Sequence, residues 1–222
     1  MNKIDLKKLK ESLPGHPGIL GEDEYLNTAV LIPLIFIDNE YHLLFEKRSA
    51  NIRQGGEICF PGGEYDENSD LSFKETAIRE TIEELGIERN NINIIGELGT
   101  LIGPMGITLN AFIGELKLND INKFNFDKIE VEKIFTIPVS YFHDNLPEVY
   151  YVRLEVHPYY FDEKGEKVIL LPVEELKLPA RYANPWGFRK RKILVYKTGE
   201  EVIWGMTANL IYEFVNKLKL SH

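Results

Sequence analysis

The stretch Arg79-Glu80-Thr81-Ile82-Glu83-Glu84-Leu85-Gly86-Ile87 decides how this chain folds and what it can bind. We expect it to contain the end of a helix that runs from Ser72 to Leu85. Ser72 and Glu75 have the spacing of a capping box, and Gly86 can end the helix in the left-handed conformation. The sequence therefore predicts a short helix with a defined start and a defined end.

This predicted helix has an apolar side and an acidic side. Successive helical residues are about 100° apart, so three apolar residues share the side that enters the core: Ile78, Ile82 and Leu85. Glu80, Glu83 and Glu84 lie on roughly the opposite side, where like charges at these spacings repel one another. A hard divalent cation, Mg²⁺ or Mn²⁺, would turn this repulsion into attraction. The alternative interpretation is a solvated acidic surface.

The segment Phe60-Pro61-Gly62-Gly63 comes before the helix and favours the metal interpretation. Because its two glycines lack side chains, the backbone can approach the helix carboxylates closely. The carbonyl oxygen of Gly63 would then add a ligand of the type that hard cations accept.

The glycine pair and the helix together resemble the Nudix box, G-x5-E-x7-R-E-U-x-E-E-x-G-U, where U is an aliphatic residue. Its second half matches this chain from Arg79 to Ile87, except that Thr81 stands at an aliphatic position. In the first half, the expected glutamate falls on Leu71 and the expected glycine on Tyr65.

The nearest match to the first half takes Gly63 and Asp70, with one extra residue in each spacer and aspartate in place of glutamate. The sequence therefore leaves open which loop carboxylate supports the site. The alternatives are Glu64, Asp66, Glu67 and Asp70.

Further segments are similar to the coenzyme A pyrophosphatase branch of the Nudix hydrolases. In chain order they are Arg48-Ser49, Arg53, Gly56 to Gly63, Thr76 to Glu80, Asn110 to Gly114, Ile137 to Phe142 and Ile203 to Ala208. They run in the family's order from about Thr28 to the last predicted helix, although the spacer after Arg53 is one residue shorter than the branch usually has.

The resemblance implies a role for each matching residue. Glu80 and Glu84 would bind Mg²⁺ or Mn²⁺ together with Gly63, and Glu83 would be a further ligand or the general base. Arg79 would hold the glutamates in place by ion pairs. Glu130 is a weaker candidate for an added carboxylate.

Five residues are candidates for substrate binding: Arg48, Arg53, Gly62, Trp186 and Arg189. Arg48 and Arg53 can grip phosphate through bidentate contacts, or they can make surface salt bridges only. Trp186 can stack on adenine while the basic run from Arg189 to Lys192 meets the 3′-phosphate of coenzyme A. The alternative is an exposed basic loop beside an aromatic residue of the core.

The pattern of predicted elements indicates an α/β (α+β) protein with a mixed β-sheet covered by helices. Predicted strands include Thr28 to Ile37, Asn93 to Leu101, Leu109 to Leu116 and Val149 to His157, and Ala208 to Leu218 is a second helix. Thr136 to Phe142 is expected as a short helix or turn. The resemblance makes this a Nudix-type α/β/α sandwich. We expect one domain over residues 1–222, with a helical N-terminal extension (about 1–20) and an insert (about 157–192).

Composition restricts the class of protein. With 44% hydrophobic and 27% charged residues, the 222-residue chain has the make-up of a globular protein. A net charge of −9 argues against general binding of nucleic acid, which needs a basic surface. The single cysteine, Cys59, excludes an internal disulfide, and neither a signal peptide nor an apolar segment of membrane-spanning length is recognised. We expect a cytoplasmic protein without a membrane partner, and a homodimer is left open.

The function that the resemblance implies is hydrolysis of the phosphoanhydride of coenzyme A or a derivative. The products would be adenosine 3′,5′-bisphosphate and 4′-phosphopantetheine. Two alternatives stay open: hydrolysis of another nucleotide conjugate, such as ADP-ribose or a dinucleoside polyphosphate, and a Nudix module that binds nucleotide without turnover. The three helix glutamates argue against the second alternative.

Overall fold

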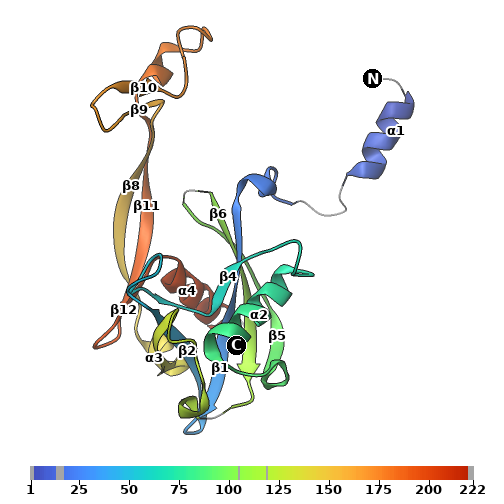
Figure 1. The fold of residues 1–222 in the computed structure, drawn as a ribbon, viewed down its shortest axis with the longest axis vertical. Coiled ribbons are helices and arrows are strands. Elements are labelled where there is room, and N and C mark those ends of the chain that lie inside the picture. The colour runs from blue at the N-terminus through green and yellow to red at the C-terminus, as the bar shows by residue number, and fades with distance from the viewer. Residues whose placement is uncertain (1–2, 14–17, 105, 119, 220–222) are drawn as a thin grey trace. The chain divides into compact units, whose positions relative to one another are not determined.

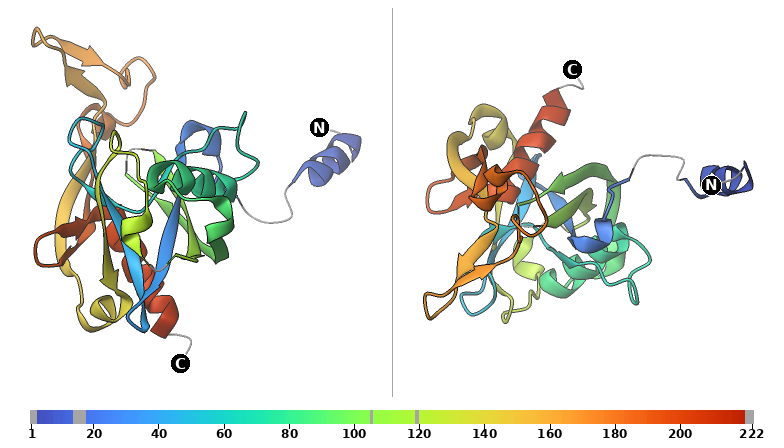
Figure 2. Two further views of the ribbon diagram at one scale, coloured as in Figure 1. Left: turned by 60° about the horizontal axis from the view of Figure 1, so that its bottom comes forward. Right: turned by 90° about the horizontal axis from the view of Figure 1, so that it is seen from above.

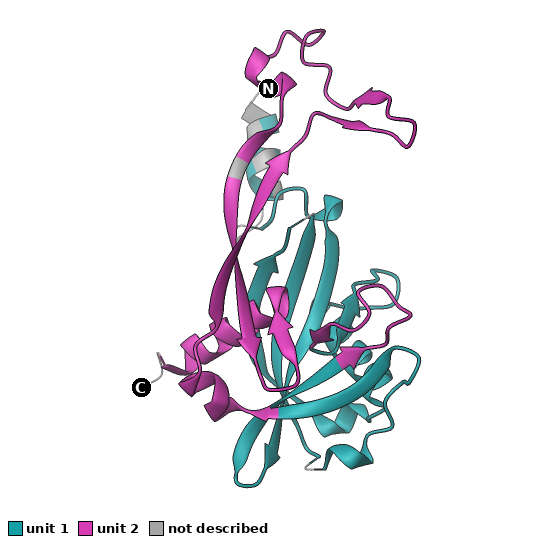
Figure 3. Cartoon of the chain, turned by 90° about the vertical axis from the view of Figure 1, so that its left-hand side faces the viewer, with its two compact units in different colours: residues 1–46, 60–136 teal, residues 47–59, 137–222 magenta. Residues whose placement is uncertain are grey.

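The computed structural model describes residues 3–13, 18–104, 106–118 and 120–219. The chain divides into two compact units (Figure 3). Unit 1 comprises Met1–Glu46 and Phe60–Thr136, and unit 2 comprises Lys47–Cys59 and Ile137–His222. Figure 1 shows the order of the helices and strands. The predicted single domain stays a prediction.

Unit 1 is built on a mixed sheet in which the long strand β1 (Leu26–Ile37) takes the central place. On one side β1 runs parallel to β6, from the pair Leu26 and Ile107 to the pair Ile35 and Leu116. On its other side β1 pairs antiparallel with β4 near its start and with β2 near its end. The remaining strands that lie wholly or mostly in unit 1 are β2 (Glu40–Arg48), β4 (Gly62–Glu64), β5 (Ile92–Ile102), β6 (Ile107–Leu116) and β7 (Val131–Pro138), whereas β3 (Ile58–Cys59) belongs to unit 2.

Helix α2 (Phe73–Leu85) contacts β1, β4 and β6 of this sheet (Figure 2). The core between them consists of buried aliphatic and aromatic residues: Ala29, Leu31, Ile35, Leu44, Ala77, Leu85, Ile87, Phe112, Leu116 and Phe124. Each of the larger side chains contributes roughly 1.5–3 kcal/mol by leaving water. This packing fixes α2 against the glycine strand β4, and that contact positions the acidic side chains described below.

Shorter helices complete unit 1. They are α1 (Lys3–Ser12) and the 3₁₀ turns η1 (Glu22–Glu24), η2 (Arg89–Asn91) and η3 (Ile121–Lys123). The predicted N-terminal helix thus exists as α1, while its apolar side chains Ile4, Leu6 and Leu9 lie outside the described part of the structure.

Unit 2 contains a three-stranded antiparallel sheet in the order β12-β11-β8. Its strands are β8 (Glu148–Val156), β11 (Trp186–Lys197) and β12 (Val202–Trp204), and a small second sheet pairs β9 (Tyr159–Phe161) with β10 (Lys167–Ile169). The helices are α3 (Val139–Asp144), the 3₁₀ turn η4 (Ala180–Ala183) and α4 (Gly205–Lys219). Helix α4 contacts α3, β11 and β12 through buried side chains that include Ile211 and Phe214.

The structure confirms the expected fold class and most predicted elements, with two corrections. Strand β7 continues through Thr136 to Pro138 before α3 begins, so the predicted short helix or turn there was partly wrong. The run from Arg189 to Lys192 is part of strand β11 and not a loop, because it pairs with β8 from Leu154 to Tyr151. No helix within the described ranges is long and apolar enough to cross a membrane.

Candidate active site

The acidic helix α2 has the ends that the sequence predicts. The Ser72 side chain accepts a hydrogen bond from the Glu75 amide at 3.3 Å, and Gly86 follows the helix in the left-handed conformation with φ 63°. The Glu75 carboxylate forms an ion pair with Arg89 at 2.8 Å. These caps determine which residues of the stretch are helical and therefore which side chains share a face.

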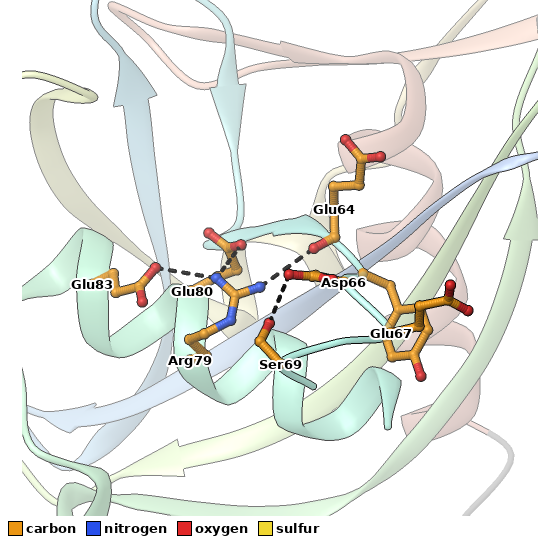
Figure 4. Close-up of a pocket in the computed structure, with 8 residues that line it drawn as sticks. Glu64, Asp66, Glu67, Ser69, Arg79, Glu80 and Glu83 are labelled. Carbon is orange, nitrogen blue, oxygen red and sulfur yellow. Dashed lines mark hydrogen bonds and ion pairs between the residues drawn. The ribbon is translucent and has the colours of Figure 1, made fainter. Parts of the chain in front are cut away.

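Arg79 is the centre of the site and contacts three carboxylates. Figure 4 shows two of them, Glu80 and Glu83. Its Nη1 donates to Glu80 Oε1 at 2.7 Å and to Glu83 Oε2 at 3.2 Å. Its Nε and Nη2 each donate to the Asp70 carboxylate at 2.9 Å, which is a bidentate contact. Asp70 and Glu80 in turn raise the pKa of Arg79. The ion pairs expected from the resemblance are thus present, and one further carboxylate takes part.

Asp70 is the loop carboxylate that contacts Arg79. Its side chain is only 2% exposed, and it also accepts a hydrogen bond from Thr76 Oγ1 at 3.0 Å. The hydrogen bonds from Arg79 lower the pKa of Asp70 to about 2. The irregular first half of the box therefore still brings a carboxylate to the arginine, in spite of the changed spacing.

The loop before Asp70 is ordered by its own hydrogen bonds. The Asp66 carboxylate accepts from the Asn68 amide at 2.9 Å and from Ser69 Oγ at 3.1 Å, and these bonds lower the pKa of Asp66. The Asp66 amide donates to the Asp70 carboxylate at 3.2 Å. The extra residues of the loop are taken up by this compact turn, which explains how Asp70 reaches Arg79.

Glu80 lies directly against the glycine strand. A Cβ atom added to Gly63 would come within 2.4 Å of the Glu80 carboxyl group, so a side chain at this position would force that carboxyl group to move. The Glu80 side chain is 16% exposed, and its burial raises the pKa of its carboxyl group. The negative charges of Glu83 and Glu130 raise this pKa further, while Arg79 lowers it.

Glu84 corrects the expected picture of the helix. It was predicted on the acidic outer side, but only 3% of it is exposed, because its Oε2 accepts a hydrogen bond from the Gly62 amide at 2.9 Å. The amide of Gly62, a predicted substrate contact, is used in this bond. Glu83 is the outermost of the three, with a side chain 58% exposed.

The buried side of α2 also differs in detail from the prediction. Ile82 is only partly buried, whereas Thr81 is completely buried. The Thr81 hydroxyl donates to the Ala77 carbonyl one turn earlier at 2.6 Å. This bond satisfies the hydroxyl and explains how threonine is accommodated where the box has an aliphatic residue.

An open acidic pocket of about 790 Å³ lies over these groups (Figure 4). It is lined by Glu64, Tyr65, Asp66, Glu67, Ser69, Arg79, Glu80 and Glu83. The only cation in this lining is Arg79, which the carboxylates around it already engage. An anionic ligand therefore needs additional positive charge to enter.

The donor set fits a hard divalent cation. Glu80 and Glu84 both meet the backbone of the Gly62-Gly63 pair, and Glu83 is one turn away on the same helix. All these groups are oxygen donors, as Mg²⁺ and Mn²⁺ prefer. Across the described ranges, no three carboxylate, imidazole or thiol side chains already converge on one point. Instead, Arg79 neutralises Glu80 and Glu83, so cation binding would compete with these ion pairs.

The other predicted substrate contacts belong to unit 2. Arg48 Nε donates to the Arg53 carbonyl at 3.3 Å, and Trp186 packs edge to face on Tyr182 with ring centroids 5.3 Å apart. Arg189 is an exposed residue of β11. The approach of these groups to the acidic pocket stays a prediction.

Comparison with known proteins decides the family. The family model described as NUDIX domain matches residues 27–188. This chain belongs to the Nudix family. The expected family is thereby confirmed, and the matched range includes the glycine pair, the loop and the whole of α2.

Curated relatives carry names of Nudix hydrolases. Nudix hydrolase 3 of Caenorhabditis elegans is 36% identical over 144 residues, which cover 61% of this chain and 58% of the relative. A peroxisomal coenzyme A diphosphatase of Mus musculus is 33% identical over 126 residues, covering 56% of this chain and 51% of the relative. This Nudix chain thus spans little more than half the length of these two relatives. An uncharacterized Nudix hydrolase of Photorhabdus laumondii is 24% identical over 97% of this chain and 96% of its own length.

Solved structures agree with the fold. A MutT/nudix family protein from Enterococcus faecalis matches 98% of this chain and 70% of its own, with a TM-score of 0.50 and 12% identity. At this identity the likeness supports the Nudix fold and nothing more specific.

Sequence reasoning did not single out Thr76 as a site residue. The threonine is completely buried and orients Asp70 through its hydroxyl. A signal was present, since Thr76 belongs to the branch-like segment Thr76 to Glu80, but its partner across the loop is set by the fold.

Proposed function

We propose that this Nudix chain hydrolyses the phosphoanhydride of coenzyme A or a close derivative with the help of Mg²⁺ or Mn²⁺. Water attacks one phosphorus atom, the bond from that phosphorus to the bridging oxygen breaks, and adenosine 3′,5′-bisphosphate and 4′-phosphopantetheine leave as products. The observation that carries the proposal is the placement of the Glu80 and Glu84 carboxylates against the Gly62-Gly63 backbone.

The residues of α2 have separate tasks in this proposal. Glu80, which lines the pocket, and the buried Glu84 beside Gly62 would hold the cation. Glu83 is more exposed and accepts the proton of the attacking water, which requires it to come within hydrogen-bond reach. When bound, the divalent cation stabilises charge on the diphosphate oxygens and lowers the pKa of the attacking water.

Arg79 and Asp70 form the support of this arrangement. The bidentate contact of Asp70 fixes the guanidinium plane, so that Nη1 stays available to Glu80 and Glu83. If a cation took over part of that negative charge, the bidentate contact with the buried Asp70 would still hold Arg79 in place.

Two observations support coenzyme A as the substrate. Branch-like segments extend through most of the chain, and one relative is named a coenzyme A diphosphatase. Arg48, Arg53 and Arg189 would provide the positive charge that the acidic pocket lacks. Within this proposal Trp186 stacks on the adenine.

The test is mass spectrometry of the products after the purified chain has been incubated with coenzyme A and Mg²⁺ or Mn²⁺ in ¹⁸O-enriched water. We expect both predicted products, with one ¹⁸O atom in only one of them. Dephospho-coenzyme A, ADP-ribose and a dinucleoside polyphosphate are run in parallel. Turnover of these compounds with intact coenzyme A would overturn the substrate, and binding without any product would indicate a silent module.

A further inference from the structure

The outer edge of strand β8 has the features of an interface with a second copy of this chain. Strand β8 pairs with β11 on one side, and within the described residues no strand pairs with its other side. It is nine residues long and forms a twisted two-stranded ribbon with β11 in unit 2 (Figure 3). An edge of this length presents backbone N–H and C=O groups that another strand can pair with.

Apolar side chains on both faces of β8 are exposed. On one face Val149 and Tyr151 are 48% and 62% exposed. On the other face Tyr150, Val152, Leu154 and Val156 are between 41% and 51% exposed. Monomeric proteins normally shorten, charge or cover such an edge. The composition of β8 therefore indicates a strand that is covered in the assembled protein.

The charges of β8 show which partner fits. Register with β11 places Lys190 directly opposite Arg153, a like-charge pair that destabilises the sheet. Arg153 also forms an ion pair with Glu155, the next residue on its own face, at 2.5 Å, and His157 lies 3.4 Å from the same carboxylate. A partner strand that brings a carboxylate to the outer side of Arg153 and a cation to Glu155 would extend this alternation of charge.

We propose that β8 pairs antiparallel with β8 of a second copy, about a twofold axis at Leu154. In this register Arg153 lies opposite Glu155 of the second copy, and Glu155 lies opposite Arg153 of the second copy. On the other face Leu154 meets its own equivalent, and Val152 meets Val156. Apolar groups thus face apolar groups, and the four charges alternate in sign.

Neighbouring registers lack this match. An axis at Arg153 would place the two arginines against each other, and an axis at Glu155 would do the same to the two glutamates. An axis at Val152 would oppose Glu155 to the apolar Val149. Among axes from Val152 to Glu155, only the axis at Leu154 therefore places unlike charges opposite each other, and the two three-stranded sheets would join into a continuous sheet with an isologous interface. This inference does not depend on the proposed catalytic function.

Charge-reversal variants of β8, measured by their monomer–dimer equilibrium, test the interface. Analytical ultracentrifugation of the full chain should show a dimer at micromolar concentration. Arg153→Glu and Glu155→Arg should each shift the equilibrium at least tenfold towards monomer, because each places like charges opposite one another. The double variant should restore the dimer. Val202→Asp removes a 50% exposed valine from β12 of the same sheet and should leave the dimer intact.

A cysteine at the axis tests the register. In a Cys59→Ser background, Leu154→Cys should form a disulfide-linked dimer under mild oxidation, since equivalent residues on the axis lie within disulfide distance. Val152→Cys should not link in this way. A monomeric wild type, or a dimer that is unaffected by either single charge reversal, would overturn the proposal. Equal cross-linking at both positions would overturn the register.

Discussion

Helix α2 and strand β11 each carry a run of like charges, and the two elements give these runs opposite outcomes. On α2 the spacing of three and four residues brings Glu80, Glu83 and Glu84 to one end of the helix beside Arg79 and the glycine strand. On β11 successive side chains alternate, so Arg189 and Arg191 lie on one face while Lys190 and Lys192 lie on the other. A cluster in sequence becomes a cluster in space only where its spacing matches the period of the element.

We expect the largest effect, a loss of catalytic rate, from a substitution on helix α2. We expect Glu84→Gln to lower kcat for coenzyme A at least about 100-fold, because outer contacts of metal sites already account for 10–100-fold. Glutamine keeps the size of the side chain and can still accept the hydrogen bond from Gly62. Steady-state kinetics over a range of Mg²⁺ concentrations checks this, with Glu88→Gln as a charge-matched control beyond the helix. Equal rates for wild type and Glu84→Gln would exclude a role of this carboxylate in turnover.

The next effect is on stability. Arg79 lowers the pKa of the buried Asp70 from 3.8 to about 2, so the ionised form stabilises the fold by about 2 kcal/mol at neutral pH. This contribution is fully present well above pH 4 and is lost as the pH falls towards 2, because the unfolded state takes up a proton in this range while Asp70 of the folded state stays ionised. Asp70→Asn should therefore be about 2 kcal/mol less stable at pH 7.

Urea unfolding of Asp70→Asn and wild type from pH 7 to pH 3 measures this difference. The two curves should keep a constant separation down to about pH 5 and approach each other below pH 4. A separation independent of pH would show that the ion pair with Arg79 does not stabilise the fold in the way proposed.

We expect a smaller effect, on KM, from substitutions in strand β11. Because Arg189 and Lys190 lie on opposite faces of β11, at most one of them can meet the 3′-phosphate of a bound coenzyme A. We expect Arg189→Ala to raise KM for coenzyme A about tenfold, because it removes one charge-assisted hydrogen bond to the substrate. Lys190→Ala should leave KM nearly unchanged. KM for dephospho-coenzyme A should not respond to either change. Equal increases in KM for both variants would contradict the two-face arrangement.

The smallest effect concerns the one position of the helix that departs from the box. Thr81→Val removes a hydroxyl that bonds only to the Ala77 carbonyl of its own helix, and it keeps a branched side chain of similar size. We expect a change in unfolding free energy of less than about 1 kcal/mol and an unchanged kcat. Thermal unfolding and kinetics of the same preparation check both. A large loss of activity would mean that the hydroxyl has a role that its hydrogen bond does not reveal.

The contrast between these elements also explains what the sequence could reveal. The limits of α2 were predictable because Ser72 and Gly86 are local signals, and the acidic residues followed from helical spacing. The burial of Glu84 was not predictable, since it depends on an amide of Gly62, which is distant in sequence. Asp70 was one of four candidates until the turn around Asp66 placed it against Arg79.

The structure around β11 and β8 was harder to predict from the sequence than helix α2. The run from Arg189 to Lys192 is equally compatible with a loop and a strand, and only pairing with β8 decides between them. Pairing partners across an insert are set by tertiary contacts, for which a single sequence contains no local signal. The exposed edge of β8 could not be inferred for the same reason.

The central claim is that the carboxylates beside the glycine pair bind a divalent cation. A titration of the purified chain with Mn²⁺, followed by electron paramagnetic resonance of the free ion, tests it without any substrate. We predict saturable binding to the wild type, binding at least about tenfold weaker in Glu80→Gln, and wild-type binding in Glu88→Gln. Equal affinities of wild type and Glu80→Gln for Mn²⁺ would contradict the account.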